Sequence, residues 1–190
     1  MLNIVLFGPP GAGKGTQSEN IIKKFKLSHI STGDLFRKHL SEGTELGKLA
    51  KNYMDEGNLV PDQVVIDMVD DKIKSSTESK GFIFDGFPRT VAQAEALDKL
   101  LNSKGTPIKG MIALEVAEDE LINRLKHRGK TSGRTDDQDE EKINNRIKVY
   151  KRETLPVAEY YKKQGKLHTI IGIGTIDEIF EKIASNIDAL

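Results

Sequence analysis

Short apolar runs alternate with longer amphipathic stretches along most of the chain. Runs rich in β-branched and aromatic residues predict strands at Leu2–Phe7, Phe82–Asp85, Met111–Val116 and Leu167–Ile171, with a weaker candidate at Ser28–Ile30. The amphipathic stretches predict helices at Gly13–Phe25, Thr90–Asn102, Glu118–His127, Glu140–Lys163 and Thr175–Ile187. Strands that alternate with helices form βαβ units, so we expect an α/β fold in which helices cover both faces of a parallel sheet.

Two segments depart from this alternation. Residues 31–75 hold two or three predicted helices without a convincing strand between them, punctuated by residues such as Gly43, Gly57 and Pro61. We therefore expect a helical insertion at the edge of the α/β core. The stretch Gly129–Asp139 is polar and has no periodicity, which predicts an exposed loop.

The composition excludes several classes of function. The 190 residues include 29 basic and 29 acidic side chains, and this zero net charge is unlike the basic excess of a nucleic-acid-binding protein. The chain has no cysteine, which excludes disulfides and a thiolate zinc site. The N-terminal apolar run is too short for a signal peptide, and no stretch is long enough to span a bilayer. We therefore expect a cytoplasmic protein with neither membrane nor nucleic-acid partners.

The segment Gly8–Lys14 (GPPGAGK) lies between a predicted strand and a predicted helix and matches a phosphate-binding loop. Its glycines allow successive backbone N–H groups to point at phosphate oxygens, and the following helix adds the positive end of its dipole. Lys14 supplies a mobile positive charge for the β- and γ-phosphates. The Ser or Thr that usually follows the lysine is replaced by Gly15, so we expect Mg²⁺ to be held mainly by phosphates and water.

Other charged residues fit the chemistry of phosphoryl transfer. Asp85 ends an apolar strand and is predicted to face Mg²⁺ through a bound water, while Arg89 lies just beyond the same strand. Transfer requires several cations at one point, and the candidates are Lys14, Arg37, Arg89, Arg124, Arg128, Arg134 and Arg146. The four histidines have no metal-ligand spacing and receive no role. The acidic run Asp136–Glu141 is predicted to be a solvated helix start rather than a metal site.

Four separated motifs together resemble the adenylate kinase family of nucleoside monophosphate kinases. They are GPPGAGKGTQ (Gly8–Gln17), STGDLFR (Ser31–Arg37), FDGFPRT (Phe84–Thr90) and SGRTDD (Ser132–Asp137), in the family's order and approximate spacing. The resemblance implies a P-loop three-layer α/β/α core with a five-stranded parallel sheet, formed by residues 1–30, 61–128 and 140–190. It also implies a helical NMP-binding insertion at residues 31–60 and a short lid without zinc at residues 129–139.

The resemblance assigns roles by position. Implied for catalysis are Lys14, Arg89, Arg128, Arg134 and Arg146, and for ATP binding Gly11, Ala12, Gly13, Lys14, Gly15, Thr16, Arg124, Arg128 and Gly174. Implied for AMP binding are Thr32, Arg37, Asn58, Leu59, Val60, Gly86, Phe87, Pro88, Arg89, Gln93, Arg134 and Arg146. Asp85 would hold Mg²⁺ through water. The interval between Arg134 and Arg146 is one residue longer than the family's usual pattern.

The implied activity is reversible Mg²⁺-dependent phosphoryl transfer, ATP + AMP = 2 ADP, by a monomer. UMP/CMP kinases share several of the motifs, but the Thr32 hydroxyl and the Gln93 amide suit the edge of adenine and favour AMP. A P-loop nucleotide switch or ATPase remains as an alternative, although no clear glutamine is available to orient an attacking water. A small-molecule kinase of the shikimate or gluconate type leaves the second and third motifs unexplained.

Overall fold

The computed structural model describes residues 1–76 and 78–190, and its centre is a five-stranded parallel sheet. The strands lie in the order β2-β3-β1-β4-β5 and comprise β1 Asn3–Phe7, β2 Ser28–Ser31, β3 Phe82–Asp85, β4 Ile108–Glu115 and β5 Leu167–Ile171. The weaker candidate strand is therefore real and lies at one edge of the sheet. The predicted α/β architecture is confirmed.

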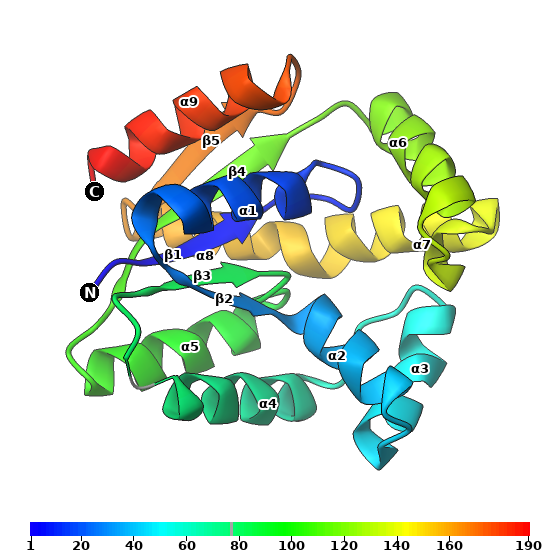
Figure 1. The fold of residues 1–190 in the computed structure, drawn as a ribbon, viewed down its shortest axis with the longest axis horizontal. Coiled ribbons are helices and arrows are strands. Elements are labelled where there is room, and N and C mark those ends of the chain that lie inside the picture. The colour runs from blue at the N-terminus through cyan, green and yellow to red at the C-terminus, as the bar shows by residue number, and fades with distance from the viewer. Residues whose placement is uncertain (77) are drawn as a thin grey trace.

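Helices cover both faces of this sheet (Figure 1). On one side lie α1 (Lys14–Phe25) and α9 (Ile176–Asp188), and on the other lie α4 (Asp62–Ser75), α5 (Val91–Ser103) and α8 (Leu155–Lys163). In the part of the chain that the structure describes, no helix has the length and apolar character needed to cross a membrane.

The alternating side chains of β1 explain why two layers of helices are needed. Val5 and Phe7 belong to the hydrophobic cluster on the α4, α5 and α8 side, and Ile4 and Leu6 belong to the cluster on the α1 and α9 side. All four are at most 4% exposed. A strand that is apolar on both faces is typical of a parallel sheet between two helical layers, and burial of each such side chain stabilises the fold by about 1.5–3 kcal/mol.

The segment at residues 31–75 is helical, as predicted. It consists of α2 (Thr32–Ser41), α3 (Glu45–Asp55) and α4, the last of which packs on the core next to α5. Ser31 and Thr44 cap α2 and α3 by accepting hydrogen bonds from the N–H groups of Asp34 and Gly47. A Cβ at Gly47 would lie 2.3 Å from the carbonyl oxygen of His39, so this glycine allows α2 and α3 to approach closely.

The predicted loop at residues 129–139 is partly wrong. Helix α6 (Glu118–Thr131) continues past the predicted end at His127, and a 3₁₀ turn, η1 (Thr135–Asp137), occupies much of the remainder. Asp137 is 2% exposed, so the acidic run is not uniformly solvated. The last turn of α6 has no apolar residue to mark it, which explains why the periodicity ended early. A solvated helix start is correct only from Asp139, which caps α7 (Glu140–Val149).

The single helix predicted at Glu140–Lys163 contains a wide turn. Helix α7 is followed by a π-helical turn, η2 (Tyr150–Thr154), and then by α8. Pro156 lies in the first turn of α8, where a missing N–H is tolerated. The two helices and the turn between them form one continuous helical segment that runs along the sheet (Figure 1).

Asn3 of β1 connects its strand to β3 and to the segment that precedes β4. Its Nδ2 donates to the carbonyl oxygen of Thr106 at 2.6 Å, and its Oδ1 accepts from the N–H of Phe82 at 3.0 Å. The pairing of β1 with β4 shifts register between Asn3 and Ile4, and beside this shift the fully buried amide satisfies one backbone acceptor before β4 and one backbone donor of β3.

We expect Asn3→Ala to lower the free energy of unfolding by about 2 kcal/mol, because it leaves a backbone donor and a backbone acceptor without a partner. Urea denaturation of the variant and of the parent chain measures the difference. The control is Asn102→Ala at an exposed position of α5, which should stay within about 0.5 kcal/mol of the parent. Equal stability of both variants would contradict the assigned role of Asn3.

Candidate active site

A cavity of about 660 Å³ opens at the carboxyl ends of β1 and β3. Its wall is formed by the loop after β1, the start of α2, the residues after α3, the loop after β3, and parts of α6, η1, α7 and η2. Ligands of open parallel sheets bind at this edge. All of the residues predicted to bind nucleotide or metal line this cavity except Ala12, which is buried behind the loop, and Gly174.

The loop after β1 has the geometry of an anion-binding site. Gly13 has a φ of +94° and forms the N-cap of α1, and no side chain caps this helix end. The first N–H groups of α1 therefore remain available to an anion. The Lys14 ammonium group donates to the carbonyl oxygens of Gly8 at 2.8 Å and Pro9 at 3.0 Å. Since an ammonium group has three donors, one remains for a phosphate oxygen.

Several positive charges converge on Lys14. Burial is the largest cause that lowers the pKa of Lys14 to about 8; Arg89, Arg146 and Arg128 lower it further, whereas Asp85 raises it. Burial also lowers the pKa of Arg89 to about 10, with Arg146 as the next cause. These mutual effects mean that the cations act on one shared region of the cavity, an arrangement that suits a group with several negative charges.

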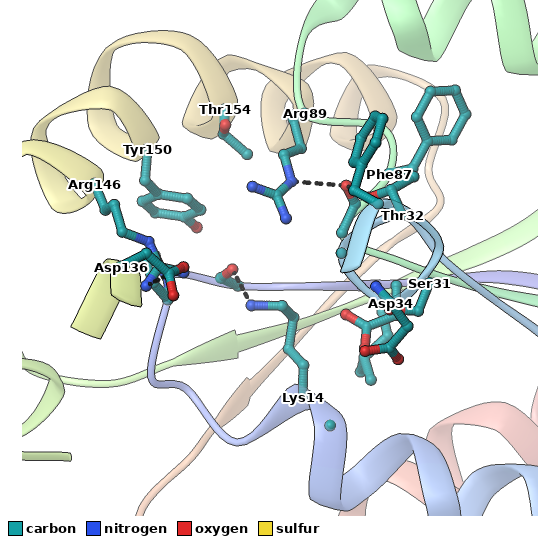
Figure 2. A pocket seen from close by; sticks show the side chains of 18 of the residues that line it. Lys14, Ser31, Thr32, Asp34, Phe87, Arg89, Asp136, Arg146, Tyr150 and Thr154 are labelled. Carbon is teal, nitrogen blue, oxygen red and sulfur yellow. Dashed lines mark hydrogen bonds and ion pairs between the residues drawn. The ribbon is translucent and has the colours of Figure 1, made fainter. Parts of the chain in front are cut away.

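Hydrogen bonds hold Arg89 in place. Its Nε donates to the carbonyl oxygen of Gly86 at 2.7 Å, and its backbone N–H donates to Gln93 Oε1 at 2.7 Å. The Thr32 hydroxyl donates to the same carbonyl of Gly86 at 2.8 Å, which joins the start of α2 to the loop after β3 (Figure 2). Gly86 has a φ of +73°, and a Cβ there would lie 2.9 Å from the Arg89 guanidinium.

The same hydrogen bonds restrict Gln93. Its Nε2 donates to Asp62 Oδ1 at 2.8 Å, and its Oε1 accepts from Arg89, so one N–H and one lone pair of the amide remain. Gln93 is 1% exposed. It therefore organises the loop after β3 in addition to lining the cavity.

The insertion contributes the opposite wall. Arg37, one turn into α2, pairs with Asp34. Burial raises the pKa of the Asp34 carboxyl group, but the hydrogen bond and the positive charge of Arg37 help to lower it overall. Asn58, Leu59 and Val60 line the cavity between α3 and α4.

Asp137 neutralises two of the predicted catalytic arginines. Its carboxylate accepts from Arg128 Nε at 2.5 Å and Nη2 at 3.0 Å, and from Arg146 Nη1 at 2.5 Å. Asp136 also pairs with Arg146 at 2.9 Å. Arg146 lines the cavity despite the longer interval from Arg134, because η1 takes up the intervening residues.

Arg124 lies farther along α6, four residues before Arg128. It donates from Nε to Glu120 at 2.7 Å and from Nη2 to the carbonyl oxygen of Gly172 at 3.2 Å. Arg124 is thereby joined to the segment after β5, two residues before Gly174, whose contact with the ATP adenine stays a prediction.

Asp85 is the acidic group best placed for a metal ion. Its carboxylate lines the cavity at the end of β3, and His29 Nε2 lies 3.7 Å from Oδ2. Among the described residues no group of three or more His, Cys, Asp or Glu side chains could hold a metal ion. A single carboxylate beside a phosphate loop fits Mg²⁺, which keeps most of its water ligands and binds nucleotide phosphates.

Sequence reasoning missed several residues of the wall. His29, which received no role, lines the cavity, and its Nε2 is buried without a hydrogen bond to any described residue. Tyr150 and Thr154 of η2 also face the cavity. Tyr150 follows Arg146 by four residues, so helical spacing was a signal that could have revealed it.

The chain is similar to known adenylate kinases over its full length. A sequence model of a family described as adenylate kinase matches residues 6–166. An adenylate kinase of Flavobacterium psychrophilum is 55% identical over 190 residues, and one of Phocaeicola vulgatus is 53% identical, each with complete coverage of both chains. An adenylate kinase of Porphyromonas gingivalis is 46% identical over 99% of this chain and 96% of its own length.

We expect Asp137→Ala to lower the free energy of unfolding by about 2–4 kcal/mol, because it leaves Arg128 and Arg146 close together without their shared carboxylate. The control is Glu140→Ala, which removes an exposed ion pair with Lys126 and should change stability by at most about 0.5 kcal/mol. Urea denaturation at neutral pH measures both variants. If the two lose the same stability, Asp137 does not organise this wall of the cavity.

Proposed function

The chain belongs to the adenylate kinase family, and we infer from this membership and from its cavity that it catalyses the reversible transfer of the γ-phosphoryl group of ATP to AMP, which yields two ADP. The observation that carries this proposal is the convergence of Lys14, Arg89 and Arg146 at the edge of the sheet, between a phosphate loop and a helical insertion.

The donor ATP occupies the half of the cavity next to β1. The backbone N–H groups of Gly11–Thr16 bind its phosphates, and Lys14 follows the β- and γ-phosphates. Arg124 lies at the far end of this half, where its guanidinium plane can stack on the adenine. Arg128 reaches the triphosphate from the same face of α6.

The acceptor AMP occupies the half between the insertion and the loop after β3. Arg37 and Arg89 bind its phosphate, and Val60 and Phe87 supply apolar contacts for the base. The Thr32 hydroxyl already donates to Gly86, but its lone pairs can accept from the adenine amino group. The remaining N–H of Gln93 can donate to a ring nitrogen.

Catalysis by this cavity consists of positioning and charge stabilisation. The phosphate of AMP is already anionic near neutral pH, since its second pKa is about 6, so no general base is required. Lys14, Arg89, Arg128, Arg134 and Arg146 stabilise the negative charge that is spread over the moving group. A bound Mg²⁺ would neutralise part of the phosphate charge, and Asp85 would hold it through water.

Residues 31–60 and 129–139 enclose the substrates from two sides. Thr135 Oγ1 of the second segment donates to Asp55 Oδ1 of the first at 3.2 Å, and next to the second segment Asn145 Nδ2 of α7 donates to the carbonyl oxygen of Glu56 at 2.6 Å. These contacts support the interpretation that the two segments close over bound nucleotides and exclude water, which would otherwise compete as an acceptor. We propose a monomeric enzyme, because the residues of one chain fill every role assigned above.

The proposal predicts that AMP is the preferred acceptor. Initial rates of diphosphate formation from Mg-ATP, measured separately with AMP, UMP, CMP, GMP and dTMP, should be at least about a hundredfold higher with AMP, because the other bases leave polar groups of the pocket without partners.

A preference for UMP or CMP would contradict the assignment of Thr32 and Gln93 but would leave the phosphate-transfer machinery intact. Absence of transfer to every acceptor, with rapid hydrolysis of ATP by water, would contradict the kinase function itself.

The lowered pKa of Lys14 predicts a specific pH dependence. A lysine with a pKa of about 8 is charged below that pH and loses its charge above it, so kcat/KM for ATP at saturating AMP should fall as the pH rises through about 8. Bound phosphates favour the charged ammonium group, so kcat itself should fall only at a higher pH. Steady-state rates measured from about pH 6 to about pH 10 give both profiles.

The matched control is Lys14→Arg, whose guanidinium group keeps its charge throughout this range. Whatever its absolute rate, the kcat/KM profile of this variant should show no decline near pH 8. A decline in both proteins would assign the titration to another group.

A further inference from the structure

Tyr150 is the first residue of a wide turn in the helical segment that continues from α7 into α8. In η2 the N–H of Leu155 donates to the carbonyl oxygen of Tyr150, five residues earlier. In a regular α-helix the ring of Pro156 would meet the carbonyl of Arg152, and the wide turn removes this conflict. Such π-helical turns within α-helices are frequent at functional sites.

The side chains of this turn face the region where the cations converge. Figure 2 shows the Tyr150 ring between Arg146 and Arg89, with its hydroxyl toward the interior of the cavity. The ring packs on Phe7 at a centroid distance of 5.8 Å, and Phe7 is the last residue before the phosphate loop. This contact fixes the ring relative to the loop that holds Lys14.

The Tyr150 hydroxyl forms no hydrogen bond with any residue that the structure describes, although it points into a polar site. Burial, together with the negative charge of Glu115, raises the pKa of Tyr150, so the phenol stays protonated and can donate. A neutral donor at this place has a particular advantage. It adds a hydrogen bond to a phosphate without adding to the repulsion between Arg89 and Arg146.

We propose that Tyr150 is a further catalytic residue, whose hydroxyl donates a hydrogen bond to a non-bridging oxygen of the phosphoryl group in transfer. This inference rests on the proposed kinase function. During the reaction an oxygen of the AMP phosphate bonds to the γ-phosphorus, while the bond from that phosphorus to the β–γ bridging oxygen breaks and its electron pair leaves with ADP. Tyr150 keeps its proton throughout.

The test is Tyr150→Phe, which removes only the hydroxyl and keeps the ring packed on Phe7. A donor that acts mainly in the transition state should leave KM for ATP and AMP almost unchanged, while kcat and kcat/KM fall together by roughly tenfold. The midpoint of thermal unfolding should not fall, because the hydroxyl makes no hydrogen bond with the rest of the protein.

The matched control is Tyr160→Phe. The Tyr160 hydroxyl donates to Asp98 at 2.9 Å, and neither residue lines the cavity. This variant should lose stability and keep its kcat and both KM values, the opposite of the result expected for Tyr150→Phe.

Four outcomes would overturn the inference. A kcat of Tyr150→Phe within about twofold of the parent value would show that the hydroxyl does not act in transfer. A rise in KM with unchanged kcat would assign it to substrate binding alone. An equal fall in kcat for both variants would reflect a general structural effect. An inactive parent chain in the same assay would refute the proposed function, and the role of Tyr150 would fall with it.

Discussion

The mutual repulsion of several cations in one small cavity is the constraint on which the site depends. Burial lowers the pKa of Lys14 to about 8, and Arg89, Arg146 and Arg128 lower it further, against the opposing effect of Asp85. The folded chain tolerates this cluster because every one of these cations donates to an acceptor within the protein. Backbone carbonyls hold Lys14 and Arg89, while the buried carboxylate of Asp137 bridges the other two. A polyphosphate that enters relieves the remaining repulsion, so the arrangement that is costly for the free protein is the one that binds anionic substrates tightly.

The parallel sheet makes this convergence possible. Lys14 follows β1 and Arg89 follows β3, two adjacent strands whose carboxyl ends lie side by side. Hydrophobic clusters on both faces of the sheet fix these strands, so the loops that carry the charges start from rigid positions. The helices α6 and α7 bring their arginines from outside the sheet. Leu125, Ile143 and Ile147 pack the two helices together, and the ion pairs with Asp137 hold their arginines in place. The cavity therefore has one wall fixed by strand pairing and a second wall in which ion pairs add to the apolar packing between two helices.

The sequence predicted the first wall better than the second. Short apolar runs ending in Gly8 and Asp85 located β1, β3 and their loops, because apolar periodicity records which residues are buried in a sheet or on a helix face. The burial of Asp137 was missed because its partners, Arg128 and Arg146, lie nine residues away on either side, and no local pattern records such pairs. The wide turn of η2 was missed because the prediction placed Pro156 inside a continuous regular helix. Only the backbone geometry shows how the helical segment accommodates this proline. The sheet order likewise depends on pairings between distant segments.

The contacts that the insertion makes with the lid and with α7 differ in kind from those of the core, and this difference bears on how substrates enter. Thr135 with Asp55 and Asn145 with Glu56 are exposed hydrogen bonds, each worth about 0.5–1.5 kcal/mol in water. No cluster of buried apolar side chains joins η1 to α3 among the described residues. Gly57 lies against the stem of Arg146, where a Cβ would come within 2.8 Å of Cγ, so the insertion and α7 approach closely at a glycine. A close but weakly bonded contact can separate and re-form at low free-energy cost, which supports the proposal that these two segments open to admit nucleotides and close for transfer.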